Sequence, residues 1–170
     1  MFRDQPFAYL QPFAFVLVTL FFILSGCSQN SDQREFEKAA FSEPNGITVT
    51  NEQGDVITVD PDDWRIAPFF QGDIEFVTLP HPNPVRTNQV LRLDIQVNFL
   101  DRITGMYIRV LRFGSFYPVD DRNQIRIGIN SFSLDAKIIA GGVPNPAGLY
   151  RLIIQDENEN VITYGDIEIQ

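Results

Sequence analysis

The sequence predicts an all-β protein, an antiparallel β-sandwich of about seven strands. Short segments in which apolar and polar residues alternate recur from Gly46 onward. Turn residues separate them at intervals of about 8–12 residues, as in β-sandwiches. No stretch after Phe41 has sustained helical periodicity. These three observations favour two packed sheets over a helical or mixed fold.

The clearest predicted strand runs from Val90 to Asn98. Its alternating pattern predicts one buried and one wet face, the buried face being formed by Leu91, Leu93, Ile95 and Val97. Further strands are predicted at Ile47–Thr50, Val56–Val59, Ile74–Leu79, Thr104–Phe113, Ile125–Asn130, Phe132–Ile138, Leu149–Gln155 and Val161–Ile169.

The strand from Leu149 to Gln155 carries a specific prediction about its faces. Tyr150, Leu152 and Ile154 alternate with Arg151. We expect the first set to face the core and Arg151 to face solvent, where its removal costs under about 1 kcal/mol.

Charge composition excludes one class of partner. The chain carries 22 acidic and 13 basic residues, a formal net charge of -9. A nucleic-acid binder needs a basic face to meet phosphate, so no nucleic-acid partner is expected. The same charge argues against electrostatic attachment to anionic lipid.

An apolar segment near the start of the chain predicts export. Phe13–Leu24 is twelve residues without a charge, which is shorter than the roughly 20 residues of a membrane-spanning helix. It has the length of a signal-peptide core. Leu24, Ser25 and Gly26 then precede Cys27, the single cysteine. An uncleaved anchor helix is the alternative, and it also leaves the following chain outside the cytoplasm.

The segment Leu24-Ser25-Gly26-Cys27 resembles the lipobox of bacterial lipoproteins. That resemblance implies cleavage before Cys27 and coupling of its thiol to diacylglycerol, with acylation of the freed amine. Two or more acyl chains give stable membrane anchoring. Ser28 stands where Asp favours retention in the inner membrane of well-studied envelopes, so the outer membrane is the expected location.

The expected organisation has four parts. Residues 1–26 form the signal peptide, and residues 27–45 form the lipidated cysteine and a polar, flexible tether with a brief helical stretch at Arg34–Phe41. Residues 46–72 form a hairpin and an irregular segment, and residues 73–170 form the sandwich.

A second resemblance covers about residues 74–170. Pro82-Asn83-Pro84 precedes the Val90–Asn98 strand, and Gly148-Leu149-Tyr150-Arg151-Leu152 precedes the closing hairpin. This pattern is similar to bacterial Ig-like modules of the flagellar-hook-capping type and to type IX secretion sorting domains. It implies an Ig-like sandwich. His81 stands where those modules usually carry Tyr, and the lipobox leaves no need for a type IX export role.

Candidate chemistry is sparse. His81 is the only histidine, so neither a pair of histidine ligands nor a catalytic triad with a second base is expected, and an exposed turn residue is the favoured interpretation. Three acidic clusters suit turns but also calcium: Asp60, Asp62 and Asp63; Asp120 and Asp121; and Asp156, Glu157 and Glu159. None matches an EF-hand loop, and nothing selects a carboxylate pair for glycoside hydrolysis. We expect no catalytic residue, metal or cofactor.

Aromatic residues leave one alternative open. Trp64, Phe69 and Phe70 lie in the irregular segment, where they either form a binding surface or plug the open edge of the core, the second being favoured. The leading hypothesis is a non-enzymatic envelope lipoprotein with a structural or protein-binding sandwich, held to the membrane by the lipid on Cys27. A carbohydrate- or ligand-binding lipoprotein is the alternative, followed by a hydrolase that uses acidic residues.

Overall fold

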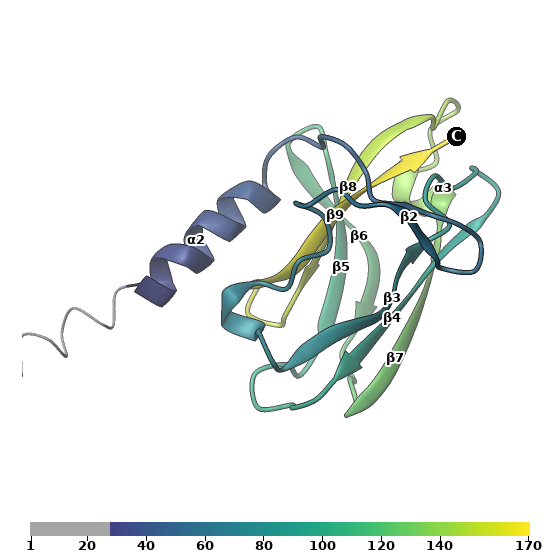
Figure 1. Ribbon diagram of the computed structural model, residues 1–170. Helices are drawn as coiled ribbons and strands as arrows, with labels where there is room; N and C mark the ends of the chain where they lie inside the picture. Colours follow the sequence, from purple (N-terminus) through teal and green to yellow (C-terminus); the bar gives the residue numbers. More distant parts are fainter. Residues whose placement is uncertain (1–27) are drawn as a thin grey trace, which may run out of the picture.

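The computed structural model describes residues 28–170, so the predicted signal peptide and Cys27 lie outside the described residues. The chain forms a helix followed by two facing sheets (Figure 1). In chain order the elements are α2 (Ser28–Ala40), β1 (Val49–Thr50), β2 (Val56–Thr58), the 3-10 turn η1 (Pro68–Phe70), β3 (Ile74–His81), β4 (Val90–Val97), β5 (Met106–Arg112), β6 (Ser115–Arg122), β7 (Gly128–Asp135), α3 (Ala136–Ala140), β8 (Gly148–Gln155) and β9 (Val161–Ile169).

Seven strands build the sandwich. One sheet has the order β3-β4-β7 and the other β6-β5-β8-β9, and every pairing within them is antiparallel. β1 and β2 form a separate small hairpin. The predicted antiparallel, Ig-like sandwich of about seven strands is confirmed.

The core lies between the two sheets. Leu91, Leu93, Ile95 and Val97 of β4 are all buried, while Arg92 is exposed, so the predicted faces of this strand are confirmed. Ile108 of β5 and Leu152 of β8 are buried in the facing sheet. Each such side chain contributes about 1.5–3 kcal/mol through its removal from water.

Two of the predicted strands correspond to a single strand in the structure. Ile125–Asn130 and Phe132–Ile138 were each expected to be strands, but one strand, β7, spans Gly128–Asp135. Asp135 then caps α3, because its carboxylate accepts a hydrogen bond of 2.8 Å from the backbone N–H of Lys137.

The strand β6 was not predicted. Pro118 and the acidic pair that follows it suggest a turn, yet they lie within β6. β6 is an edge strand of its sheet. Proline has no N–H to donate, and edge strands tolerate it because one of their sides has no partner strand.

The expectation of a flexible tether after Cys27 is wrong for residues 28–40. These residues form α2, and the helical stretch expected at Arg34–Phe41 is its C-terminal part. Phe36 and Ala40 are buried against the sandwich, and the ring of Phe36 lies 5.0 Å from that of Tyr164 in β9. Phe36 and Ala40 lie one turn apart, so with the partly buried Ala39 they form a small apolar face that docks an otherwise polar helix.

The irregular segment before β3 covers the free edge of β9. The backbone N–H of Trp64 donates to the carbonyl of Tyr164 at 2.7 Å, and that of Ala67 donates to Ile162 at 2.8 Å. Further along, the N–H of Val85 donates to Glu168 at 2.8 Å. An open edge invites pairing with other chains, so this cover protects the sheet.

Within residues 28–170, no helix has the length and apolarity needed to cross a membrane.

Leu152→Ala tests the packing of β8. Leu152 is 1% exposed, so we expect the free energy of unfolding to fall by about 2–5 kcal/mol. Leu149→Ala on the same strand is the control, because Leu149 is 45% exposed and should cost less than about 0.5 kcal/mol. Denaturant unfolding midpoints measure both variants, and equal costs would contradict the assignment of faces.

Candidate functional site: a buried arginine network and the surface pockets

Arg151 is buried, contrary to the prediction that it faces solvent. It is 5% exposed and lies opposite Asp166 in the β8–β9 register. The prediction assumed that one face of β8 is wet. α2 packs against β9 on the outside of this sheet, so that face is covered as well.

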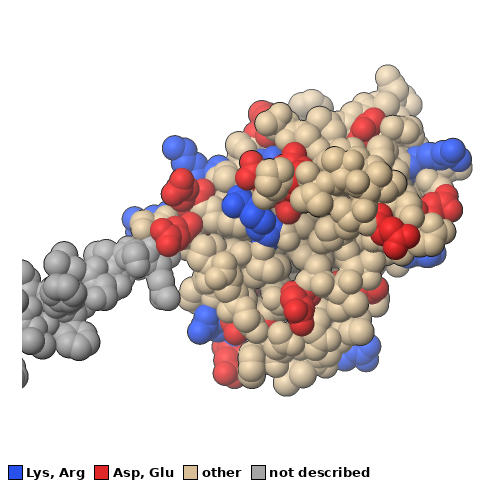
Figure 2. All heavy atoms as spheres, in the orientation of Figure 1, with Lys and Arg blue, Asp and Glu red and all other residues tan. Residues whose placement is uncertain are grey.

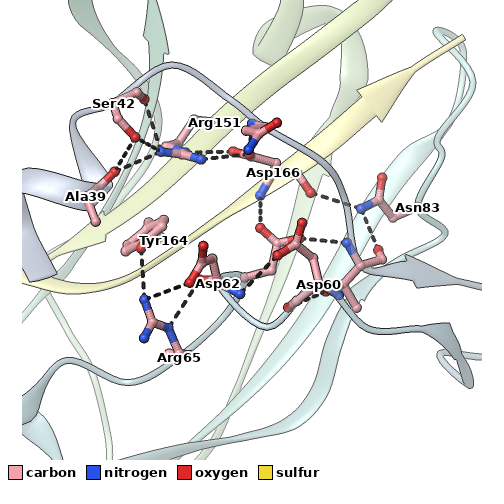
Figure 3. A network of polar contacts seen from close by, with 12 residues as sticks. Ala39, Ser42, Asp60, Asp62, Arg65, Asn83, Arg151, Tyr164 and Asp166 are labelled. Carbon is pink, nitrogen blue, oxygen red and sulfur yellow. Dashed lines mark hydrogen bonds and ion pairs between the residues drawn. The ribbon is translucent and has the colours of Figure 1, made fainter.

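The guanidinium of Arg151 has a complete set of acceptors (Figure 3). Nε donates to Oδ1 of Asp166 at 2.7 Å, and Nη2 donates to Oδ2 at 2.7 Å, a bidentate arrangement. Nη1 donates to the carbonyl of Ala39 at 2.8 Å and to the hydroxyl of Ser42 at 2.8 Å. The pair therefore joins the C-terminal end of α2 to the closing hairpin.

Asp63 extends the network to the segment that follows α2. Its carboxylate accepts from the backbone N–H of Thr48 at 2.6 Å and from that of Asp166 at 2.8 Å. The pKa of Asp63 is raised to about 6, mainly by burial; the two backbone hydrogen bonds lower it, and the neighbouring carboxylates of Asp166 and Asp60 raise it.

Asn83 closes the network from the other side. It is fully buried, and its amide nitrogen donates to the carbonyls of Thr48 at 2.8 Å and Asp166 at 3.0 Å. Its amide oxygen accepts from the N–H of Glu168 at 3.0 Å. The Pro82-Asn83-Pro84 motif thus places one side chain that crosslinks three segments. Because every charged group here meets a protein partner, the network stabilises the fold and offers no open site.

Sequence reasoning missed this network, although one signal was present. Arg151 and Asp166 face each other across a predicted hairpin, and opposite charges at paired positions attract. Their burial depends on α2, whose docking the polar sequence does not reveal.

His81 is the last residue of β3, so the prediction of an exposed turn residue is wrong. It is half-buried, and its Nδ1 lies 2.9 Å from the carbonyl oxygen of Leu79. It lines a shallow depression of about 350 Å³ together with Glu52, Gln53 and Arg92. Across the part of the chain that the structure describes, no three His, Cys, Asp or Glu side chains are grouped to hold a metal ion.

The acidic clusters separate into turn and ion-pair roles. Asp60 accepts from the N–H of Asp62 at 3.0 Å, and Asp62 pairs with Arg65 at 3.4 Å on the surface. Asp156 is buried and accepts from the N–H groups of Asn158 and Asn160, both at 2.8 Å.

The other residues of these clusters lie in ion pairs of β6 or in the last hairpin. Asp120 pairs with Arg122 at 3.5 Å, and Asp121 pairs with Arg109. Glu157 and Glu159 are exposed in the last hairpin. Figure 2 shows acidic and basic side chains scattered over the visible face, without a patch of one sign.

The aromatic residues mostly plug the core, as favoured. Trp64 is 5% exposed and Phe70 is fully buried. The indole lies where any Cβ on Gly165 would stand, and it meets the ring of Phe76 edge-on at 5.9 Å. Phe69 is 47% exposed and lies under the guanidinium of Arg102. Trp64 and Phe70 therefore provide no aromatic binding platform.

Comparison with known proteins gives little beyond the fold. No family model matches this chain, and no curated protein matches it significantly. An NMR structure of a CARDB domain from Pyrococcus furiosus is similar at 20% identity, covering 56% of this chain and 89% of that one, with a TM-score of 0.31. A crystal structure of a CARDB domain from the same organism, in complex with di-metal ions, is similar at 18% identity over 57% and 84%, with a TM-score of 0.31. Likenesses this slight carry no argument about this chain.

Arg151→Ala tests the central ion pair. It leaves Asp166, which is 1% exposed, as a buried charge without its cation, so the free energy of unfolding should fall by about 3–5 kcal/mol. Arg92→Ala, at an exposed position on β4, is the matched control and should cost less than about 0.5 kcal/mol. Equal denaturant midpoints for the two variants would show that the network contributes nothing to stability.

The raised pKa of Asp63 predicts that the free energy of unfolding depends on pH. Its folded pKa of about 6 lies above its ordinary value of 3.8, so the folded protein binds this proton more tightly than the unfolded chain does. The stability it contributes is full below pH 3.8 and is lost as pH rises through about 6. The difference in unfolding free energy between wild type and Asp63→Asn should therefore fall over this range. A difference that is constant with pH would contradict the raised pKa.

Proposed function

We propose that this protein is a lipid-anchored envelope protein whose β-sandwich is a non-enzymatic structural or protein-binding module. The observation that carries the proposal is the sequence Leu24-Ser25-Gly26-Cys27 directly after a twelve-residue apolar segment. The small residues suit a peptidase that accepts extended backbone at the cut, and the thiol is the group that carries lipid. Ser28 favours the outer membrane as the location.

The structure adds a mechanical argument to this proposal. Cys27 adjoins Ser28, the first residue of α2, so a lipid on Cys27 is one peptide bond from a helix. The helix has 13 residues and a length of about 20 Å at 1.5 Å per residue. Its C-terminal part is fixed by Phe36, Ala40 and the bonds from Arg151 to Ala39. In this arrangement α2 is a short, stiff spacer between membrane and sandwich.

The contacts of the polar groups favour a module over an enzyme. The buried charges at Arg151, Asp166 and Asp63 hold each other and backbone groups. The alternative is a carbohydrate-binding lipoprotein that uses the aromatic residues of the irregular segment. Trp64 and Phe70 are buried in the core, so they are not available to bind a ligand. Binding therefore has to use another surface.

Cys27→Ala tests the anchor. In the native host, the wild-type protein should incorporate an acyl-chain probe, and the variant should lose the label and accumulate as uncleaved precursor. Ser28→Ala is the control, because it changes the next residue and leaves the acceptor thiol in place. A wild-type protein that takes up no label would refute the lipid anchor.

A further inference from the structure

A depression at one end of the sandwich has an unusual lining. It measures about 290 Å³ and lies between the β5–β6 turn, the loop after α3 and the start of β8. Three exposed apolar side chains line it, with exposed fractions of 95% for Phe113, 45% for Leu149 and 41% for Val143. Exposed apolar groups gathered around one depression are typical of binding surfaces.

One cation in this lining lacks a partner. Arg112 is half-buried, and its Nε is shielded from solvent with no hydrogen-bond acceptor. Within residues 28–170, its guanidinium forms neither a hydrogen bond nor an ion pair, whereas Arg65, Arg102, Arg109, Arg122 and Arg151 each have a carboxylate. A partly desolvated guanidinium without an acceptor is costly, and an anion would relieve that cost.

The surroundings hold the guanidinium in place. It lies over the ring of Tyr117, 4.2 Å from the centroid. The backbone of Gly141 also approaches so closely that any Cβ there would overlap Nη1. Gly141 also has a φ of 75°, which suits glycine. Stacking and close packing fix the planar donor fork, as two-point recognition of a carboxylate requires.

The start of β8 adds an open strand edge to the same place. Pairing between β5 and β8 ends at Leu111 opposite Arg151. Gly148, Leu149 and Tyr150 pair with β9 on one side, but within residues 28–170 they have no strand partner on the β5 side. Extended backbone with a free edge can accept a peptide as an added strand.

We propose that this depression binds a carboxylate of an extended peptide segment in a partner protein, with Arg112 as the anion-binding residue and Phe113, Leu149 and Val143 as the apolar rim. The inference rests on the proposed function and deepens it, since it assigns the partner site of the protein-binding module. The depression also includes Glu43 and Pro44, a few residues beyond the end of α2. The site thus lies near the opposite end of the helix from Ser28, away from the lipid that the proposed function assigns to Cys27.

Glu43 gives the proposal a sharp internal test. It is exposed, lines the same depression and forms no ion pair with Arg112. A carboxylate ligand would meet it as a like charge. Glu43→Gln should therefore strengthen carboxylate binding, while Arg112→Gln should weaken it.

The experiment is an NMR titration of the full-length protein in detergent micelles, observing the Arg112 Nε–H signal. The probes are an acetylated tetrapeptide of three glycines and a terminal leucine as the free acid, the same peptide as its amide, and an amidated version with glutamate in place of leucine. The free acid should bind about tenfold or more tightly than its amide. Binding of the amidated glutamate peptide would support the site and identify an acidic side chain as the source of the carboxylate.

Four variants complete the design. Arg112→Gln should abolish the preference for acid over amide, Arg112→Lys should retain part of it, and Glu43→Gln should raise the affinity for the acid. Arg92→Gln, at an exposed arginine outside the depression, should change nothing. The comparison of acid with amide on the wild-type protein needs no variant, so a misfolded Arg112 variant does not block the test.

The proposal is overturned if neither carboxylate peptide binds more tightly than the leucine amide, if none of them shifts the Arg112 signal, or if acetate alone binds as well as the peptides. Those results would leave acyl labelling of Cys27 untouched. Loss of acyl labelling, in turn, would leave the titration interpretable, so the two proposals fail separately.

Discussion

The ion pair between Arg151 and Asp166 is the contact on which the N-terminal third of the described chain depends. Arg151 binds the end of α2 through Ala39 and Ser42, while Asp166 binds Asn45 through its carboxylate and Asp63 through its backbone N–H. Two buried charges are costly unless both are fully bonded, and here the acceptors come from the segments that must be held. The pair therefore fixes where those segments lie as well as how strongly they bind.

The sequence predicts the parts of the fold that have one wet face. β4 alternates cleanly because one of its faces meets solvent, so its pattern identifies both strand and core. β8 and β9 are covered on both faces, and alternation then misplaces Arg151. β6 is not predicted because Pro118 suggests a turn, and this proline is tolerated only because the strand lies at the edge of its sheet. The failures share one cause: tertiary neighbours decide the environment, and periodicity does not report them.

The candidate site follows the same rule. The residues that stand out in the sequence by type do not form the candidate site: His81 ends β3, and Asp120 and Asp121 form ion pairs. Arg112 does not stand out, because an arginine at a strand end has no distinctive neighbours in the sequence. Its relation to Tyr117 follows from the β5–β6 hairpin, but that to Gly141 requires a loop nearly 30 residues away. Burial without an acceptor is a property of three-dimensional surroundings alone.

The cover over β9 has a consequence for the order in which the chain acquires its structure. In the proposed export the chain crosses the membrane starting from its amino terminus. The helix α2 and the Trp64–Ala67 segment then emerge long before β9, the last strand in chain order. The bond from Asp166 to Asp63 spans 103 residues, and contacts so distant in sequence form slowly. Until β9 is present, α2 and the Trp64–Ala67 segment lack the strand to which they bind, so their apolar side chains stay exposed. Under the export proposed above, the cover over β9 forms only after the last strand has crossed the membrane.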